Sequence, residues 1–139
     1  MKIPVATDGL CARLARRLSE CPEQLAVQIR TTNGAVRWSW ADLVAGAAAV
    51  ANHLRTVGVG AGEPVLILRR TSARLIADYL GALLYGARPC LLAPPNPRME
   101  PMAFARRLEG LLGKFTSDHT EAPWIIADAQ VQRHVSFFT

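Results

Sequence analysis

Short apolar runs alternate with a segment of helical spacing in the middle of the chain, between residues 63 and 95. Residues 64–69 are mostly branched and apolar, as expected of a strand that is covered on both faces. The apolar positions that follow recur at helical spacing: Leu75, Ile76, Tyr79, Leu80, Leu83 and Leu84. A second apolar run covers residues 88–93. This order predicts a βαβ unit, whose right-handed crossover makes the two strands parallel.

Two residues mark the ends of the helix in this unit. Ser72 precedes it and can accept a hydrogen bond from a free backbone N–H of the first turn. Gly86 stands where the helix should stop, at a position that favours the left-handed conformation. We therefore expect Gly86 to end the helix and turn the chain directly into the second strand.

The N-terminal part of the chain predicts a further helix. Its buried stripe consists of three leucines: Leu10, Leu14 and Leu18. Thr7 or Asp8 can cap its start, and Pro22 ends it.

An antiparallel hairpin is predicted next, from alternating residues 25–30 and 35–40. In the first strand Val27 and Ile29 point to one face. Asn33 and Gly34 separate the runs, and both tolerate positive φ, so this pair is expected to form the turn.

A second capped helix follows the hairpin. Ser39 and Asp42 have the spacing of a capping box, and Gly58 is the expected C-cap. Its apolar stripe is Leu43, Ala47, Val50 and Leu54. The many alanines in this helix predict close packing against a sheet.

The last part of the chain predicts a helix and a third strand. The helix spans residues 102–112, with a rigid proline turn at residues 94–97 before it and a polar loop at residues 116–122 after it. The strand covers residues 123–127 and is expected beside the earlier two, while residues 129–139 carry no clear pattern. We predict a single domain over residues 1–139.

Charge and hydropathy exclude several classes of protein. The net charge is +5, from 16 basic and 11 acidic residues, and the basic residues are nearly all arginine. Solvated arginines on helix faces are favoured over a nucleic-acid surface, because no aromatic platform or known nucleic-acid motif accompanies them. No apolar run reaches the ~18 residues of a membrane helix. Because the start has no apolar signal region, we expect a cytoplasmic protein that binds neither nucleic acid nor membrane.

The residues that most often carry chemistry form no site. Three cysteines (Cys11, Cys21 and Cys90) and three histidines (His53, His119 and His134) lack the spacing of metal ligands. Cys90 is expected to be a small core residue, and His53 to lie at the edge of its helix stripe. The glycine-rich residues 58–62 follow a helix and open a strand, the reverse of a dinucleotide-binding loop. Residues 110–114 have glycines too close together for a phosphate loop, and no Ser or Thr follows the lysine.

Four segments, in their order along the chain, carry a family resemblance. They are a Cys-Pro-Glu step into the first strand (residues 21–27), a hydroxyl-capped helix start (38–43), a glycine-spaced link into a core strand (54–65) and a helix–glycine–strand–proline signature (80–95). The set resembles the N-terminal portion of the adenylate-forming enzymes: acyl-CoA synthetases, fatty-acyl-AMP ligases and peptide-synthetase adenylation domains. The resemblance covers residues 10–128.

The resemblance implies an α/β fold. The expected architecture is a three-layer-like parallel βαβ core with an N-terminal helix and an antiparallel β-hairpin, within the N-terminal subdomain of such an enzyme. The Pro-Pro-Asn-Pro turn at residues 94–97 looks closer to fatty-acyl-AMP ligases and to loading ligases of polyketide assembly lines. Amino-acid adenylation domains usually carry an acidic residue before this proline.

The departure from the family is large. Its chemistry depends on a Ser/Thr/Gly-rich loop with Pro-Lys for ATP phosphates, a ribose-binding aspartate and a mobile C-terminal domain with a catalytic lysine. None of these motifs occurs in residues 1–139. We therefore assign no catalytic, cofactor-binding or metal-binding residue, and ATP and magnesium are implied only for a complete family member.

Three hypotheses remain. The chain is an N-terminal fragment or split piece of an acyl- or aminoacyl-adenylate-forming ligase of a polyketide or peptide assembly line, inactive alone. Alternatively, it is a free-standing truncated homologue that acts as a non-catalytic binding or scaffold module. A small basic nucleic-acid-binding protein is the least supported. The expected partners are a second copy of the chain, the remaining part of a ligase, or a carrier protein or assembly-line module.

Overall fold

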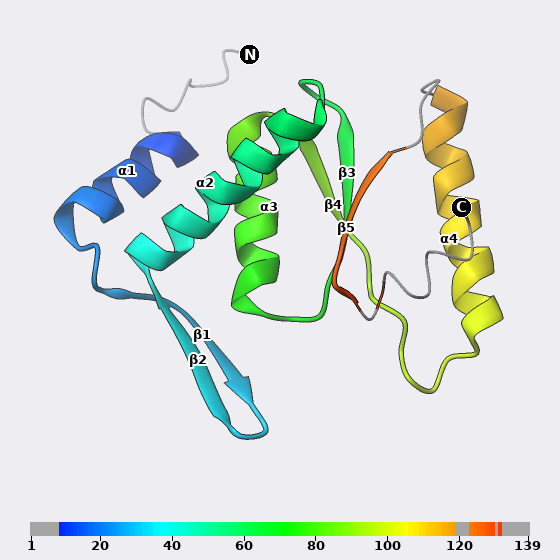
Figure 1. Cartoon of the computed structure of the whole chain (residues 1–139), viewed down its shortest axis with the longest axis horizontal. Coiled ribbons are helices and arrows are strands. Elements are labelled where there is room, and N and C mark those ends of the chain that lie inside the picture. The colour runs from blue at the N-terminus through cyan, green and yellow to red at the C-terminus, as the bar shows by residue number, and fades with distance from the viewer. Residues whose placement is uncertain (1–8, 119–122, 130, 132–139) are drawn as a thin grey trace, which may run out of the picture.

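Three parallel strands separate two layers of helices (Figure 1). The computed structural model describes residues 9–118, 123–129 and 131. The elements follow in the order α1 (Leu10–Glu20), β1 (Leu25–Thr31), β2 (Gly34–Ser39), α2 (Trp40–Val57), β3 (Pro64–Leu68), α3 (Ala73–Tyr85), β4 (Arg88–Leu91), α4 (Pro101–Asp118) and β5 (Trp124–Ala127). Helices α2 and α3 lie on one side of the sheet and α4 on the other (Figure 1).

The sheet has the strand order β4-β3-β5, and both pairs are parallel. The βαβ unit β3-α3-β4 is therefore confirmed, and so is the third strand. Among the described residues, strand β5 pairs with β3 and no other strand, on the side opposite β4.

The central strand β3 is buried along its whole length. Because successive side chains of a strand point to opposite faces, β3 supplies two cores. Val65 and Ile67 pack into a cluster with Leu54 of α2 and Ala82 of α3. On the other face Leu66 and Leu68 form the second core. They pack with Phe104 and Leu108 of α4 and with Val131. No sequence pattern had indicated that Val131 belongs to this core.

Helices α2 and α3 approach each other through small residues. An added Cβ at Gly81 would lie 2.6 Å from the Ala47 carbonyl oxygen and 2.6 Å from the Val50 Cβ. The buried residues of α3 are Ala73, Ala77, Asp78, Gly81 and Ala82. The predicted stripe of large side chains was therefore wrong in part, because α2 leaves no room for them. Leu83 is 39% exposed.

Four predicted helix ends are confirmed. Ser39 and Asp42 form the capping box of α2, and the Ser72 hydroxyl accepts from the Leu75 N–H at 3.1 Å. Gly58 and Gly86 end α2 and α3 with φ of 88° and 93°. Left-handed residues at these positions let the chain turn at once toward β3 and β4.

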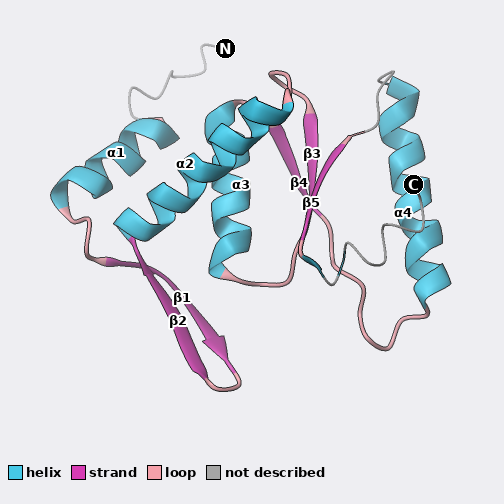
Figure 2. Ribbon diagram, viewed as in Figure 1, coloured by secondary structure: helices cyan, strands magenta, loops and turns pink. Residues whose placement is uncertain are grey.

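The hairpin is confirmed, but its turn differs from the prediction. Thr31 pairs with Gly34, so the turn residues are Thr32 and Asn33. Within the hairpin, Gly34 has a positive φ of 139°, and Asn33 does not have a positive φ. Figure 2 shows the hairpin extending away from the sheet.

Two helices depart from their predicted limits or packing. In α1 only Leu14 is buried, while Leu10 and Leu18 are 41% and 39% exposed. Gly9 is the N-cap of α1 without a side-chain hydrogen bond, and the predicted caps Thr7 and Asp8 lie outside the described residues. Helix α4 runs to Asp118, six residues beyond the predicted end, so the predicted loop at 116–118 was wrong.

Candidate functional site

A cleft of about 340 Å³ opens at the carboxyl end of β3. In parallel sheets, ligands usually bind in a crevice beside the carboxyl ends of the strands. The cleft lies between α2, the start of α3, and β5. Its walls combine small and apolar residues of α2 and β5 with four ionisable side chains: His53, Arg69, Arg74 and Asp78.

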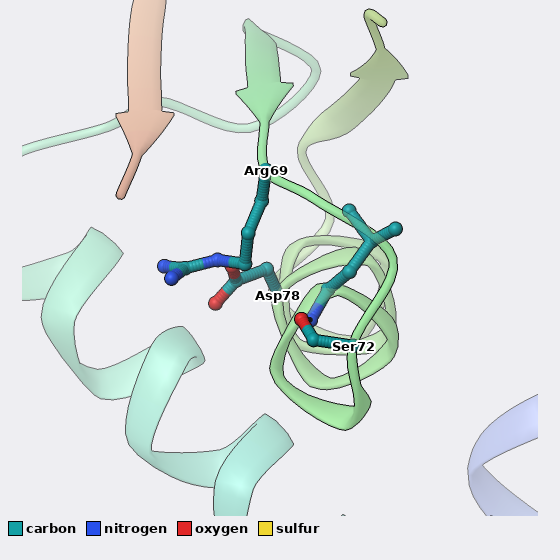
Figure 3. A network of polar contacts seen from close by, with 4 residues as sticks. Arg69, Ser72 and Asp78 are labelled. Atoms are coloured by element: carbon teal, nitrogen blue, oxygen red, sulfur yellow. Dashed lines mark hydrogen bonds and ion pairs between the residues drawn. The ribbon is translucent and has the colours of Figure 1, made fainter. Parts of the chain in front are cut away.

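Two of these charged side chains, Arg69 and Asp78, form a buried ion pair. Arg69 directly follows β3, and its Nε donates to the Asp78 Oδ2 of α3 at 2.6 Å. Asp78 is 2% exposed, whereas the Arg69 side chain is 20% exposed. Figure 3 shows Arg69 reaching from the end of the strand to Asp78, with Ser72 at the start of the helix nearby. The pair ties the carboxyl end of β3 to the second turn of α3.

Burial sets the protonation behaviour of Asp78. Loss of water contact raises its pKa above the ordinary value of 3.8, because burial disfavours the charged carboxylate. The hydrogen bond and the charge of Arg69 lower the pKa, and the charge of Arg74 lowers it further, but burial is the larger effect. The carboxylate therefore depends on both arginines for its charge.

The sequence prediction did not identify the Arg69–Asp78 pair. Asp78 lies in a segment whose neighbours Ala77 and Tyr79 indicate only a core helix. A signal was available: a single acidic residue on the small-residue face of an apolar helix, nine positions after an arginine that ends a buried strand. A buried carboxylate is almost always paired, so this combination could have been proposed.

His53 of α2 also lines the cleft and is exposed. This agrees with its predicted place at the edge of the helix stripe. His119 and His134 lie outside the described residues. In the described part of the chain no three His, Cys, Asp or Glu side chains gather as metal ligands.

The glycine-rich link at residues 58–62 is held by internal hydrogen bonds. The Gly60 N–H donates to the Glu63 Oε2 at 2.9 Å, and the Trp124 Nε1 donates to the same oxygen at 3.0 Å. The Gly62 N–H donates to the Gly86 carbonyl at 2.8 Å. The N–H groups of Gly58 and Val59 donate to carbonyls of α2, so four amides of the link are already used. The link therefore joins α2 to the sheet rather than cradling phosphate. Residues 110–114 lie inside α4 and form part of that helix. Neither of the two glycine-containing segments is therefore a phosphate loop.

The cysteines are free thiols. Cys90 is half-buried against the second core, as predicted, while Cys11 is exposed. Within residues 9–118, 123–129 and 131, no helix has both the length and the apolar character of a membrane span.

Comparison with known proteins identifies the family. The three-layer fold with its glycine-closed βαβ unit is that of the N-terminal region of adenylate-forming enzymes. A family model described as AMP-binding enzyme matches residues 14–123, and the chain belongs to this family. Among curated proteins, no sequence matches the chain.

Several solved structures share the fold. A fatty acid AMP ligase from Legionella pneumophila is 21% identical with a TM-score of 0.69, over 91% of this chain and 20% of that one. The adenylation domain of a keto acid-selecting NRPS module, bound to keto acyl adenylate, is 21% identical with a TM-score of 0.72, over 91% and 22%. ATP-bound MatB from Rhodopseudomonas palustris is 25% identical with a TM-score of 0.65, over 91% and 22%. The chain thus spans about a fifth of the length of the solved structures it matches.

Proposed function

We propose that the chain forms the N-terminal part of an acyl- or aminoacyl-adenylate-forming ligase. Such a ligase joins a carboxylate to ATP, releases pyrophosphate, and passes the acyl group to the thiol of a carrier protein or coenzyme A. The observation that carries the proposal is the family match over residues 14–123. The likeness in fold to a fatty acid AMP ligase and to an adenylation domain supports it.

The described residues do not fit ATP and magnesium. The glycine-rich link has amides engaged within the protein, and the described residues hold no carboxylate cluster for a metal ion. Within a ligase, the contribution of this chain is structural: it supplies three parallel strands and the helices that cover them. The chain alone is therefore proposed to be non-catalytic.

A place in a polyketide or peptide assembly line is part of the same proposal. It is supported by the turn at residues 94–97, which resembles that of fatty-acyl-AMP ligases and loading ligases. In the structure this turn is stiffened by Asn96, whose carbonyl accepts from the Met99 N–H at 2.8 Å and whose side chain accepts from the Arg98 N–H at 3.0 Å. The partner would be a carrier protein, and the location would be the cytoplasm.

ATP–pyrophosphate exchange tests the proposal. The 139-residue chain alone should give no exchange with any carboxylic acid, because adenylyl transfer needs positioned groups that stabilise charge. Exchange should appear when the chain is joined to the sequence encoded after Thr139 in its own reading frame. Exchange by the isolated chain above a blank without enzyme would contradict the non-catalytic role, once contaminating ligases are excluded.

A non-catalytic binding module is the second candidate. It is favoured by the outer strands β4 and β5, each of which pairs on one side only within the described residues. Such edges offer backbone groups to another chain. A stop codon directly after Thr139 would support the module, whereas an open frame that encodes a phosphate-binding loop would support the ligase.

A further inference from the structure

The cleft at the carboxyl end of β3 has one cationic wall and one apolar wall. Arg69 and Arg74 stand on the first, and Asp78 is the one acidic residue among the lining side chains. With His53 neutral, the lining therefore carries one net positive charge. Val50 of α2 and Ile126 of β5 contribute to the apolar side.

The arginines keep hydrogen-bonding capacity for a ligand. Asp78 engages the Nε of Arg69, and within the described residues neither the two Nη groups of Arg69 nor the guanidinium of Arg74 makes a hydrogen bond. In Figure 3 the Arg69 guanidinium extends past Asp78 on the side where α2 lies. Because Asp78 fixes Arg69 through a single nitrogen, the outer edge of the guanidinium is held in place while it remains available. A guanidinium held in this way suits the two oxygens of a carboxylate or phosphate.

We propose that this cleft binds a small organic oxyanion, with a carboxylate or phosphate head group on Arg69 and Arg74 and an apolar body against Val50 and Ile126. The volume of about 340 Å³ lies at the small end of ligand pockets, which suits a compact molecule. The proposal goes beyond the ligase role proposed above, and it rests on the residues that line the cleft.

Isothermal titration of the 139-residue chain tests the site with three probes of similar size. Phenyl phosphate and benzoate should bind saturably, and the tighter of the two identifies the head group. Neutral benzamide should not bind. Equal binding of benzamide, or no saturable binding of either anion, would overturn the proposal.

A matched pair of arginine variants separates a site from general attraction of anions. Arg74→Gln removes a cleft guanidinium and should weaken binding of the better anion about tenfold, the usual size of a charge-assisted hydrogen bond. Arg70→Gln makes the same change in charge at an exposed residue that does not line the cleft, so it should leave binding unchanged. Both residues are exposed, so both variants should fold. Equal losses in the two would overturn the proposal.

A change at Asp78 should act in the opposite direction. Asp78→Asn keeps an amide oxygen that can accept from the Arg69 Nε but removes the negative charge beside the guanidinium, so it should tighten anion binding. For the same reason, affinity for a probe that stays anionic should rise as pH falls and Asp78 takes up a proton. The charged or titratable side chains around Asp78 in the cleft are Arg69, Arg74 and His53. His53→Gln, introduced into both the unchanged protein and the Asp78→Asn variant, removes the contribution of the histidine. If the pH dependence of binding then persists unchanged in the Asp78→Asn variant, the role of Arg69 is contradicted.

Discussion

Gly81 of α3 lies directly against Ala47 and Val50 of α2. The distances of 2.6 Å from its absent Cβ to the Ala47 oxygen and the Val50 Cβ are shorter than any normal contact. Gly81→Ala should therefore destabilise the protein by about 1–3 kcal/mol, although alanine favours the helix. Urea unfolding measures the change.

Gly110 of α4 is the matched control, because an added Cβ there meets no atom within 4 Å. Gly110→Ala should stabilise the protein by up to about 1 kcal/mol through helix propensity alone. If both variants shifted the unfolding free energy in the same direction, packing against α2 would not determine the effect of Gly81→Ala.

The Arg69–Asp78 pair should show the cost of an unmatched buried charge. Arg69→Met leaves the carboxylate of Asp78 with only Arg74 to oppose burial, and should cost about 3 kcal/mol at neutral pH. The double variant Arg69→Met with Asp78→Leu should recover most of this loss of stability, because it removes both charges. A double variant as unstable as Arg69→Met would show that the loss comes from packing of the arginine stem.

The pH dependence of stability follows from the same residue. Burial raises the pKa of Asp78 above 3.8, so its contribution to stability is fully present below that pH and is lost as pH rises through the raised pKa. Without Arg69 the pKa rises further, so the penalty of Arg69→Met should shrink as the solution is acidified. Unfolding free energies compared at several pH values measure this difference.

At the scale of elements, the closure of α3 by Gly86 can be tested directly. Its φ of 93° is strained for any residue with a Cβ, while an added Cβ meets no atom within 4 Å. Gly86→Val should therefore cost more than about 1 kcal/mol through the backbone alone. Gly86→Asn should cost less, because asparagine tolerates the left-handed region. An unchanged melting temperature for the valine variant would show that Gly86 does not constrain the helix end.

Local signals predicted the elements well, and contacts between elements account for what was missed. Ser39, Ser72 and Gly86 act through their own backbone neighbourhood, so sequence spacing was sufficient to place them. The burial of Gly81 and Asp78 depends on where α2 crosses α3 and where Arg69 ends its strand. Because hydropathy counts large apolar residues, it included the exposed Leu83 in the buried stripe of α3 and left out the small residues beside α2.

At the scale of the whole molecule, the apolar outer strands favour association. Leu91 of β4 is 54% exposed and Trp124 of β5 is 39% exposed, and each strand pairs on one side only in the described part of the chain. Unpaired strand edges and large apolar patches promote contact with another chain. The isolated chain should therefore self-associate as its concentration rises, or bind the remaining part of a ligase.

Sedimentation equilibrium over a wide concentration range measures this association. A strictly monomeric mass at the highest concentration, together with no binding of a hydrophobic dye, would contradict the expectation. Arginine-rich surfaces should keep the assemblies soluble, since the net charge is +5.

Strand β3 couples the unfolding of the two cores, because its side chains alternate between them along the strand. If either helical layer separates from the sheet, it exposes residues of β3 that are direct sequence neighbours of residues covered by the other layer. Local openings should therefore leave β3 intact, and the backbone amides of Leu66 and Ile67 should exchange with deuterated water only when the entire molecule unfolds. Their exchange free energies should equal the unfolding free energy from urea, whereas those of the β1–β2 hairpin, which extends from the body, should be smaller.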